Sequence, residues 1–181
     1  MTIETNRLFL RPLTPADVDN LLEYQSDPDV IRFIPWPVRD REMVAEAITK
    51  LLEFIGTGET GLNQTYAMEL KSSGKVIGQV NYMFKDGHDF QREIGYVIKP
   101  AFGGQGYVHE ALTAMVTHIF GIGDVERVYA KIDARNTLSE KVAQRLGMRK
   151  EAHHIRDDFF KGEWTDSLIY AILKSEWAPT E

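Results

Sequence analysis

Three glycines within four residues, Gly103, Gly104 and Gly106, stand between a segment typical of a β-strand and one typical of an amphipathic helix. The first N–H groups of a helix have no partner inside the helix, and the helix dipole is positive there. Because glycine has no side chain, a phosphate can approach such a backbone closely. The pattern predicts either an anion-binding loop or a tight turn that needs positive φ values.

The residues after the loop exclude two classes of phosphate-binding protein. A P-loop needs a lysine and a hydroxyl directly after its last glycine, where this chain has Tyr107 and Val108. A dinucleotide-binding fingerprint needs a further glycine in the helix, where His109 stands. Nucleoside triphosphate hydrolysis and Rossmann-type oxidoreduction are therefore not expected.

The composition of the 181-residue chain restricts the chemistry further. It contains no cysteine, which excludes thiolate nucleophiles and thiolate metal sites. The adjacent His153 and His154 lack a third ligand at metal spacing, so no metal is expected. A net charge of -6 argues against nucleic acid as a partner. With no signal-like or membrane-spanning apolar segment, we expect no membrane association and a cytoplasmic protein.

The elements that must position the loop alternate between strands and helices. Alternating apolar residues and turn residues predict strands at residues 7–12, 66–70, 76–84, 93–98, 128–132 and 167–173. Helical spacing and capping residues predict helices that begin near Pro15, Asp40, Tyr107 and Thr137. Gly56 and Gly58 are expected to end the second helix, and Thr137 and Glu140 have capping-box spacing. This order predicts a mixed α/β domain.

Short motifs spread over almost the whole chain resemble those of the GNAT acetyltransferase superfamily. Within it, they are most similar to the RimJ/RimL-type branch, which acetylates protein N-termini and other amines. The resemblance lies in residues 5–14, 26–30, 93–96 (Glu-Ile-Gly-Tyr), 104–107 (Gly-Gln-Gly-Tyr), 110–112, 136–139 (Asn-Thr-Leu-Ser) and 146–148, and in Asp17, Gly162, Asp166, Tyr170, Glu176 and Trp177.

This resemblance implies one GNAT domain over residues 1–181, an α/β (α+β) fold. Its mixed, mostly antiparallel central sheet would have about seven strands and about four flanking helices, with a V-shaped splay between strands four and five. It also implies acetyl-CoA as the acetyl donor. The implied cofactor-binding residues are Val97, Ile98, Gly103, Gly104, Gln105, Gly106, Tyr107, Val108, Asn136 and Ser139. Ala101 stands where the superfamily usually has Gln or Arg, so one side-chain contact is not expected.

The implied reaction is direct attack of a primary amine on the thioester, without an acyl-enzyme. Amines are protonated near neutrality, so a base must first remove a proton. We expect Glu93 to be this base and to border the acceptor, with Asp157 and Asp158 as rival carboxylates. Ser139 stands where the family places a hydroxyl that can protonate the leaving thiolate, and Trp36 is expected to line the acceptor site.

Each of these residues also has a structural interpretation, as a surface carboxylate, a turn residue or a local hydrogen-bonding group. Two kinds of acceptor are compatible with the sequence, a protein N-terminal α-amine and a small-molecule amine. A second hypothesis is a non-catalytic acyl-CoA-binding or sensing domain that keeps the phosphate loop without the chemistry. A monomer and a homodimer are both compatible with the sequence.

Overall fold

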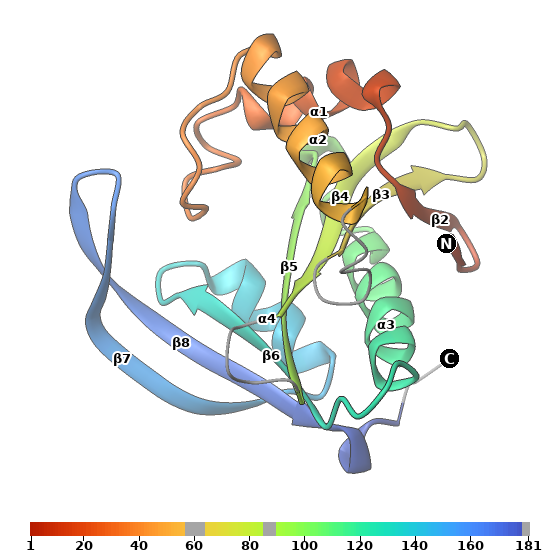
Figure 1. The fold of residues 1–181 in the computed structure, drawn as a ribbon. Helices are drawn as coiled ribbons and strands as arrows, with labels where there is room; N and C mark the ends of the chain where they lie inside the picture. Colours follow the sequence, from red (N-terminus) through yellow and green to blue (C-terminus); the bar gives the residue numbers. More distant parts are fainter. Residues whose placement is uncertain (57–63, 85–89, 179–181) are drawn as a thin grey trace.

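The computed structural model describes residues 1–56, 64–84 and 90–178, whose strands form one mixed sheet with helices on both faces (Figure 1). The strands are β1 (Ile3–Glu4), β2 (Leu8–Pro12), β3 (Gln64–Leu70), β4 (Val76–Met83), β5 (Gln91–Ile98), β6 (Arg127–Asp133), β7 (Arg149–Phe160) and β8 (Glu163–Leu173). The α-helices are α1 (Val18–Gln25), α2 (Arg41–Gly56), α3 (Tyr107–Phe120) and α4 (Thr137–Arg145).

The eight strands of this sheet lie in the order β1-β2-β3-β4-β5-β6-β8-β7. Every neighbouring pair is antiparallel except β5 and β6, which are parallel. The predicted α/β fold and the four helices are confirmed, and the strand beyond the expected seven is the two-residue β1. Gly58, named above as a helix end, lies outside the described residues.

The expected splay lies between β5 and β6. Their ladder consists of the pairs at residues 91–93 of β5 and 127–129 of β6. Beyond Glu93 and Tyr129 the two strands diverge, and β6 continues beside β8 as far as Asp133 (Figure 1). The sheet is therefore open along its midline, in a V that widens toward the C-terminal end of β5.

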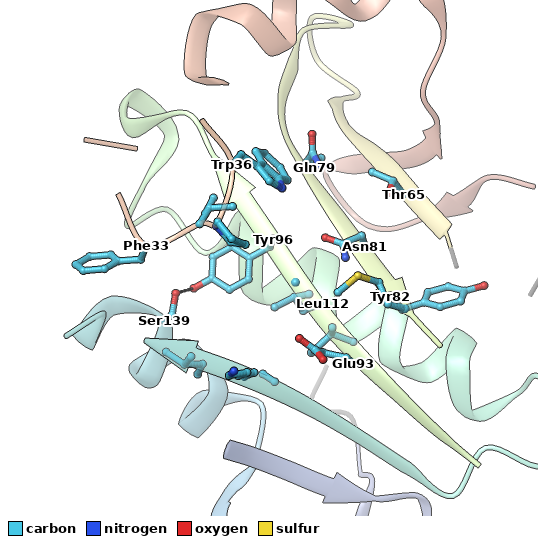
Figure 2. Close-up of a pocket in the computed structure, with 18 of the residues that line it drawn as sticks. Phe33, Trp36, Thr65, Gln79, Asn81, Tyr82, Glu93, Tyr96, Leu112 and Ser139 are labelled. Carbon is cyan, nitrogen blue, oxygen red and sulfur yellow. Dashed lines mark hydrogen bonds between the residues drawn. The ribbon is translucent and has the colours of Figure 1, made fainter. Parts of the chain in front are cut away.

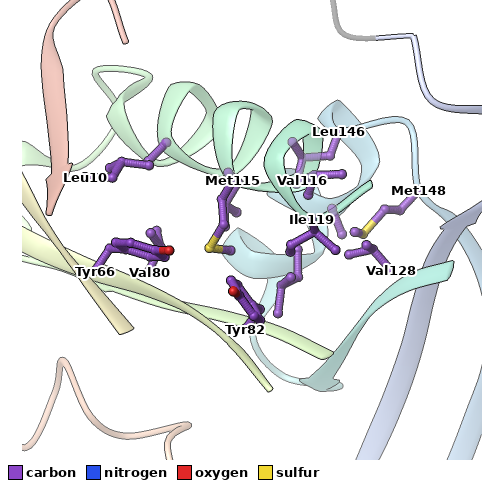
Figure 3. Close-up of a cluster of buried hydrophobic side chains, with 14 of the residues drawn as sticks. Leu10, Tyr66, Val80, Tyr82, Met115, Val116, Ile119, Val128, Leu146 and Met148 are labelled. Carbon is purple, nitrogen blue, oxygen red and sulfur yellow. The ribbon is translucent and has the colours of Figure 1, made fainter. Parts of the chain in front are cut away.

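Two hydrophobic clusters hold the helices to opposite faces of the sheet. One lies under α3 and α4 and includes Leu10, Tyr82, Met115 and Ile119 (Figure 3). The other lies under α1 and α2 and is formed by Leu13, Leu21, Tyr24, Val44, Ile48, Ala67, Val76 and Val97. Because side chains alternate along a strand, each face of β4 and β5 receives its own set of residues.

The start of α4 differs in detail from the sequence prediction. Asn136 is the N-cap, and its side-chain oxygen accepts the N–H of Ser139 at 3.1 Å. The expected capping box of Thr137 and Glu140 is wrong, because the helix begins with its cap one residue earlier. Glu140 instead accepts a hydrogen bond from the Tyr170 hydroxyl at 2.6 Å.

Candidate active site

The glycine loop has the backbone geometry of an exposed anion site. Gly104 and Gly106 have φ of 73° and 82°, and Gly106 is the N-cap of α3. A Cβ added at Gly104 would meet no atom within 4 Å, so the space above the loop is open. Gly103 has an ordinary φ of -64°. The positive φ values and the free amides occur together here, so the loop fits a phosphate group.

Arg7, which is not among the predicted site residues, holds this loop in place. Its Nη1 donates to the carbonyl of Gln105 at 3.0 Å, and its guanidinium lies 4.2 Å from the centre of the Tyr107 ring. Its Nε also pairs with Glu110 on α3 at 2.6 Å. Gln105 donates in turn to the carbonyl of Ala101 at 3.1 Å. The contacts of Arg7 join segments about a hundred residues apart, which local sequence patterns do not reveal.

The main chain of β5 is open where β6 diverges from it. The N–H of Lys99 donates to Ile77 of β4 at 2.8 Å. Main-chain groups in an antiparallel pair face the same neighbour at every second residue. Val97 therefore faces β4, while Tyr96 and Ile98 point their N–H and C=O groups into the splay. Val97 and Ile98 are both predicted to bind the cofactor. Of the two, Ile98 has its main-chain groups in the splay, and the other residue so oriented is Tyr96 instead of Val97.

A cavity of about 680 Å³ passes through the sheet at the splay. Its lining includes Ile48 and Leu51 from α2 on one face and Leu112 and Ala143 from α3 and α4 on the other. Figure 2 shows Trp36 and Gln79 at one end of this space and Glu93 at the other. The Tyr96 side chain lies between these two ends and reaches toward Ser139. A ligand that enters beside α3 and a ligand that enters beside α2 can meet inside it.

Glu93 lines this cavity, and its side chain is half-buried. The hydroxyl of Tyr129 donates to its Oε2 at 3.0 Å. Burial and the neighbouring carboxylate raise the pKa of Tyr129 to about 12, so the phenol stays protonated. Since Tyr129 is neutral and occupies one oxygen, the other oxygen of Glu93 is available to a group in the cavity.

Ser139 and Tyr96 join the two sides of the splay. The Tyr96 hydroxyl donates to Ser139 Oγ at 2.9 Å (Figure 2). Burial raises the pKa of Tyr96, so both hydroxyls carry protons at neutral pH. Asn136 also lines the cavity while capping α4. Val108, in the first turn of α3, packs against the hydrophobic core.

Of the two rival carboxylates, Asp158 lines a smaller cavity of about 180 Å³, whose lining also includes Glu93. Lys131 lies 3.0 Å from Asp158 and 3.3 Å from Asp157, so one ammonium already pairs with both carboxylates. At the tip of the same hairpin, Lys161 Nζ donates to the carbonyl of Ile31 at 2.5 Å. This bond joins the β7–β8 hairpin to the loop before α2.

Trp36, which is predicted to line the acceptor site, lines the larger cavity. The guanidinium of Arg39 lies 4.6 Å from the centre of its indole ring. Within residues 1–56, 64–84 and 90–178, no group of three His, Cys, Asp or Glu side chains could hold a metal ion. In the same ranges no helix is long and apolar enough to cross a membrane.

Comparison with known proteins gives consistent results. The acetyltransferase (GNAT) domain model matches residues 7–149. The chain is 30% identical to the uncharacterized N-acetyltransferase YnaD of Bacillus subtilis (strain 168), over 98% of this chain and 99% of that one. It is 25% identical to the ribosomal protein uS5-alanine N-acetyltransferase of Escherichia coli (strain K12), over 98% and 93%.

Solved structures share the fold. A GNAT-family acetyltransferase from Bacillus anthracis superposes with a TM-score of 0.87 at 28% identity, covering 97% of this chain and 100% of that one. The ribosomal L7/L12 α-N-protein acetyltransferase RimL, in complex with coenzyme A, has a TM-score of 0.83 at 21% identity, covering 96% and 98%.

Proposed function

The chain belongs to the GNAT acetyltransferase family, and on that premise we propose that it transfers an acetyl group from acetyl-CoA to a primary amine by direct attack in a ternary complex. One observation carries this proposal. A single cavity passes through the sheet, with the Glu93 carboxylate on the face of α2 and the Ser139 hydroxyl on the side of α4. A proton acceptor and a proton donor thus flank the space where two substrates can meet.

Residues on both sides of the splay would hold the donor. The amides of Gly104, Gln105, Gly106 and Tyr107 would bind its phosphates, and the free main-chain groups of Tyr96 and Ile98 would pair with its pantetheine arm. Asn136 would contact the arm from the other side. Once bound, acetyl-CoA supplies a thioester carbonyl to the attacking amine.

The residues of the chain would then move protons. Glu93 accepts one proton from the incoming ammonium through water, which frees the nitrogen lone pair for attack. A main-chain N–H of Tyr96 or Ile98 stabilises the negative charge that develops on the carbonyl oxygen. Ser139 gives its proton to the departing thiolate, and Tyr96, which donates to Ser139, replaces that proton. As the amide forms, the nitrogen loses its second proton to water, which returns it to Tyr96.

The acceptor we propose is the α-amine of a protein N-terminus, which would place the reaction in the cytoplasm. The support is the likeness to an enzyme whose name states that it acetylates an alanine of ribosomal protein uS5. A small-molecule amine is the competing acceptor, because one fold serves many substrates.

The test is an acceptor screen that follows released coenzyme A with a thiol reagent, to which a chain without cysteine adds no background. Peptides with free N-termini, the same peptides acetylated at the N-terminus, and small amines form the panel. We expect thiol release with free peptide N-termini and none with the blocked peptides. Binding of acetyl-CoA without release by any amine would favour the sensing domain instead.

A further inference from the structure

Arg39 is a charged residue of the cavity that the proposed reaction does not use. It lies between Trp36 and the start of α2, is half-buried and contributes to the cavity lining. Its Nη1 donates to Gln25 Oε1 at 2.8 Å, and its guanidinium stacks on Trp36. A guanidinium has five N–H donors, so most of them are left for a ligand.

No carboxylate in the described ranges pairs with Arg39. Three other cations near the sheet do have such partners: Arg11 pairs with Asp17, Lys99 with Glu23, and Lys131 with Asp157 and Asp158. Burial lowers the pKa of Arg39, which reflects the loss of water around its charge. A cation held in a cavity without a counterion favours an anionic ligand.

The groups around Arg39 fix its position. Gln25 also donates to Gln79 Oε1 at 3.2 Å, and the hydroxyl of Tyr24 donates to the same oxygen at 2.9 Å. Gln79 and Tyr24 are buried, so this chain of hydrogen bonds connects Arg39 rigidly to β4. Lys50 is a further cation of the lining and pairs with Glu46 at 2.7 Å.

The register of the sheet gives the distance between Gln79, which lies at the Arg39 end of the cavity, and Glu93 at the other end. Glu93 is opposite Met83, four residues along β4 from Gln79. At about 3.3 Å per residue, the two ends are about 13 Å apart. Trp36 and Gln79 lie at one end and Glu93 at the other (Figure 2). An extended peptide rises by about 3.3–3.6 Å per residue, so its third or fourth residue would reach Arg39 when its amine is at Glu93.

We propose that Arg39 binds an anionic group of the acceptor, a carboxylate on the third or fourth residue of an extended chain whose first residue carries the amine that is acetylated. This inference rests on the proposed function, because the amine is placed at Glu93. The carboxylate has two possible sources, an acidic side chain near a protein N-terminus or the C-terminus of a short peptide. Both satisfy the same guanidinium through paired N–H···O bonds.

The test compares matched acceptors. One arm uses alanine-based hexapeptide amides with Asp or Asn at position 3 or 4, and the other uses tri- and tetra-alanine with a free or an amidated C-terminus. We expect the charged member of a pair to have a kcat/KM at least 10-fold higher, mainly through a lower KM. The first arm detects a side-chain carboxylate and the second a terminal one.

Two variants separate recognition from structure. Arg39→Gln should remove the preference for charge while leaving kcat/KM for the neutral acceptors within about 3-fold, and Arg39→Lys should restore part of the preference. The control is Arg32→Gln, an exposed arginine of the same loop that does not line the cavity, and it should keep the preference. Thermal unfolding confirms that each variant is folded.

Two results would overturn this inference. One is equal kcat/KM for charged and neutral acceptors in the wild-type protein. The other is an equal loss for both kinds of acceptor in Arg39→Gln, which would make Arg39 a structural residue. Failure of the proposed function would give a different result from failure of this inference. Coenzyme A would then be released with neither the charged nor the neutral acceptors.

Discussion

Two carboxylates that look alike in the sequence differ in what surrounds them. Glu93 receives a hydrogen bond from the neutral Tyr129, whereas Asp158 pairs with the ammonium of Lys131. The Lys131 ammonium already occupies the Asp158 carboxylate, so an incoming amine would have to compete with it for the same oxygens. Glu93 also lines both cavities, while Asp158 lines the smaller one. The geometry therefore favours Glu93 as the base.

Replacement of Glu93 by Gln tests this assignment. The amide keeps an oxygen for the Tyr129 hydroxyl but cannot accept the proton of the amine, so we expect kcat to fall by about 10²–10⁴-fold. Asp158→Asn is the matched control and should change kcat by less than about 10-fold. Steady-state rates of coenzyme A release measure both. A larger loss for Asp158→Asn than for Glu93→Gln would move the base to the hairpin.

Ser139 allows a clean test of the proton donor, because its two hydrogen-bonding groups have separate tasks. Its main-chain N–H satisfies the Asn136 cap, and its hydroxyl receives the Tyr96 hydrogen bond. Ser139→Ala should thus keep the start of α4 and lower kcat by about 10²-fold. Thermal unfolding should change little, since the cap is retained. An unchanged kcat would show that water or Tyr96 protonates the thiolate.

The turn between β5 and α3 works through its backbone, so its glycines are its functional residues. At Gly104, alanine fits the open space but is strained at positive φ by about 1–2 kcal/mol. Its methyl group would also stand where a phosphate approaches. We expect Gly104→Ala to raise the KM for acetyl-CoA by at least about 10-fold with a smaller change in kcat.

The β3–β4 turn supplies the control for this variant. Gly74 has φ of 69° and equally open surroundings, so Gly74→Ala carries the same backbone strain away from the loop. Both variants should lose similar stability in denaturant unfolding, and Gly74→Ala should keep the wild-type KM. A similar rise in KM for both would mean that strain, and not the lost phosphate site, weakens binding.

The sequence predicts most elements, because local signals determine them. The Pro15 and Asp40 signals precede α1 and α2, and the glycines precede α3. The long β7 shows little alternation because most of its residues are exposed at the edge of the sheet, so no buried face sets a period. The cap of α4 differs by one residue, a shift that spacing alone does not resolve.

The candidate site is less predictable, because its decisive contacts are long-range. The hydrogen bonds from Arg7 to the Gln105 carbonyl and from Tyr96 to Ser139 join residues that are far apart in the sequence and meet only in the folded chain. The orientation of Val97 away from the splay follows from the register with β4, which no local pattern states. Within the described ranges, the lack of a carboxylate partner for Arg39 can be seen only when its neighbours are placed in space. Its proposed role therefore requires the structure.

The molecule as a whole is two sheet segments joined along a short parallel ladder. β1 to β5 form one segment and β6, β8 and β7 the other, and the pairs at residues 91–93 and 127–129 connect them. Across the open part of the V, the Tyr96–Ser139 hydrogen bond is one direct link. A ligand that contacts both segments would replace the missing ladder, so donor binding should stabilise the entire fold.

Thermal unfolding measures this coupling. Acetyl-CoA at about 100 times its Kd should add about 2.7 kcal/mol, which for a chain of this size raises Tm by about 5–10 °C. Adenosine 3′,5′-bisphosphate, which reaches the glycine loop but has no arm to enter the V, should give a smaller shift at the same concentration. Gly104→Ala should reduce both shifts. If nucleotides raised Tm and acetyl-CoA did not, the glycine loop would serve another phosphate ligand, and the donor site proposed between β5 and β6 would be abandoned.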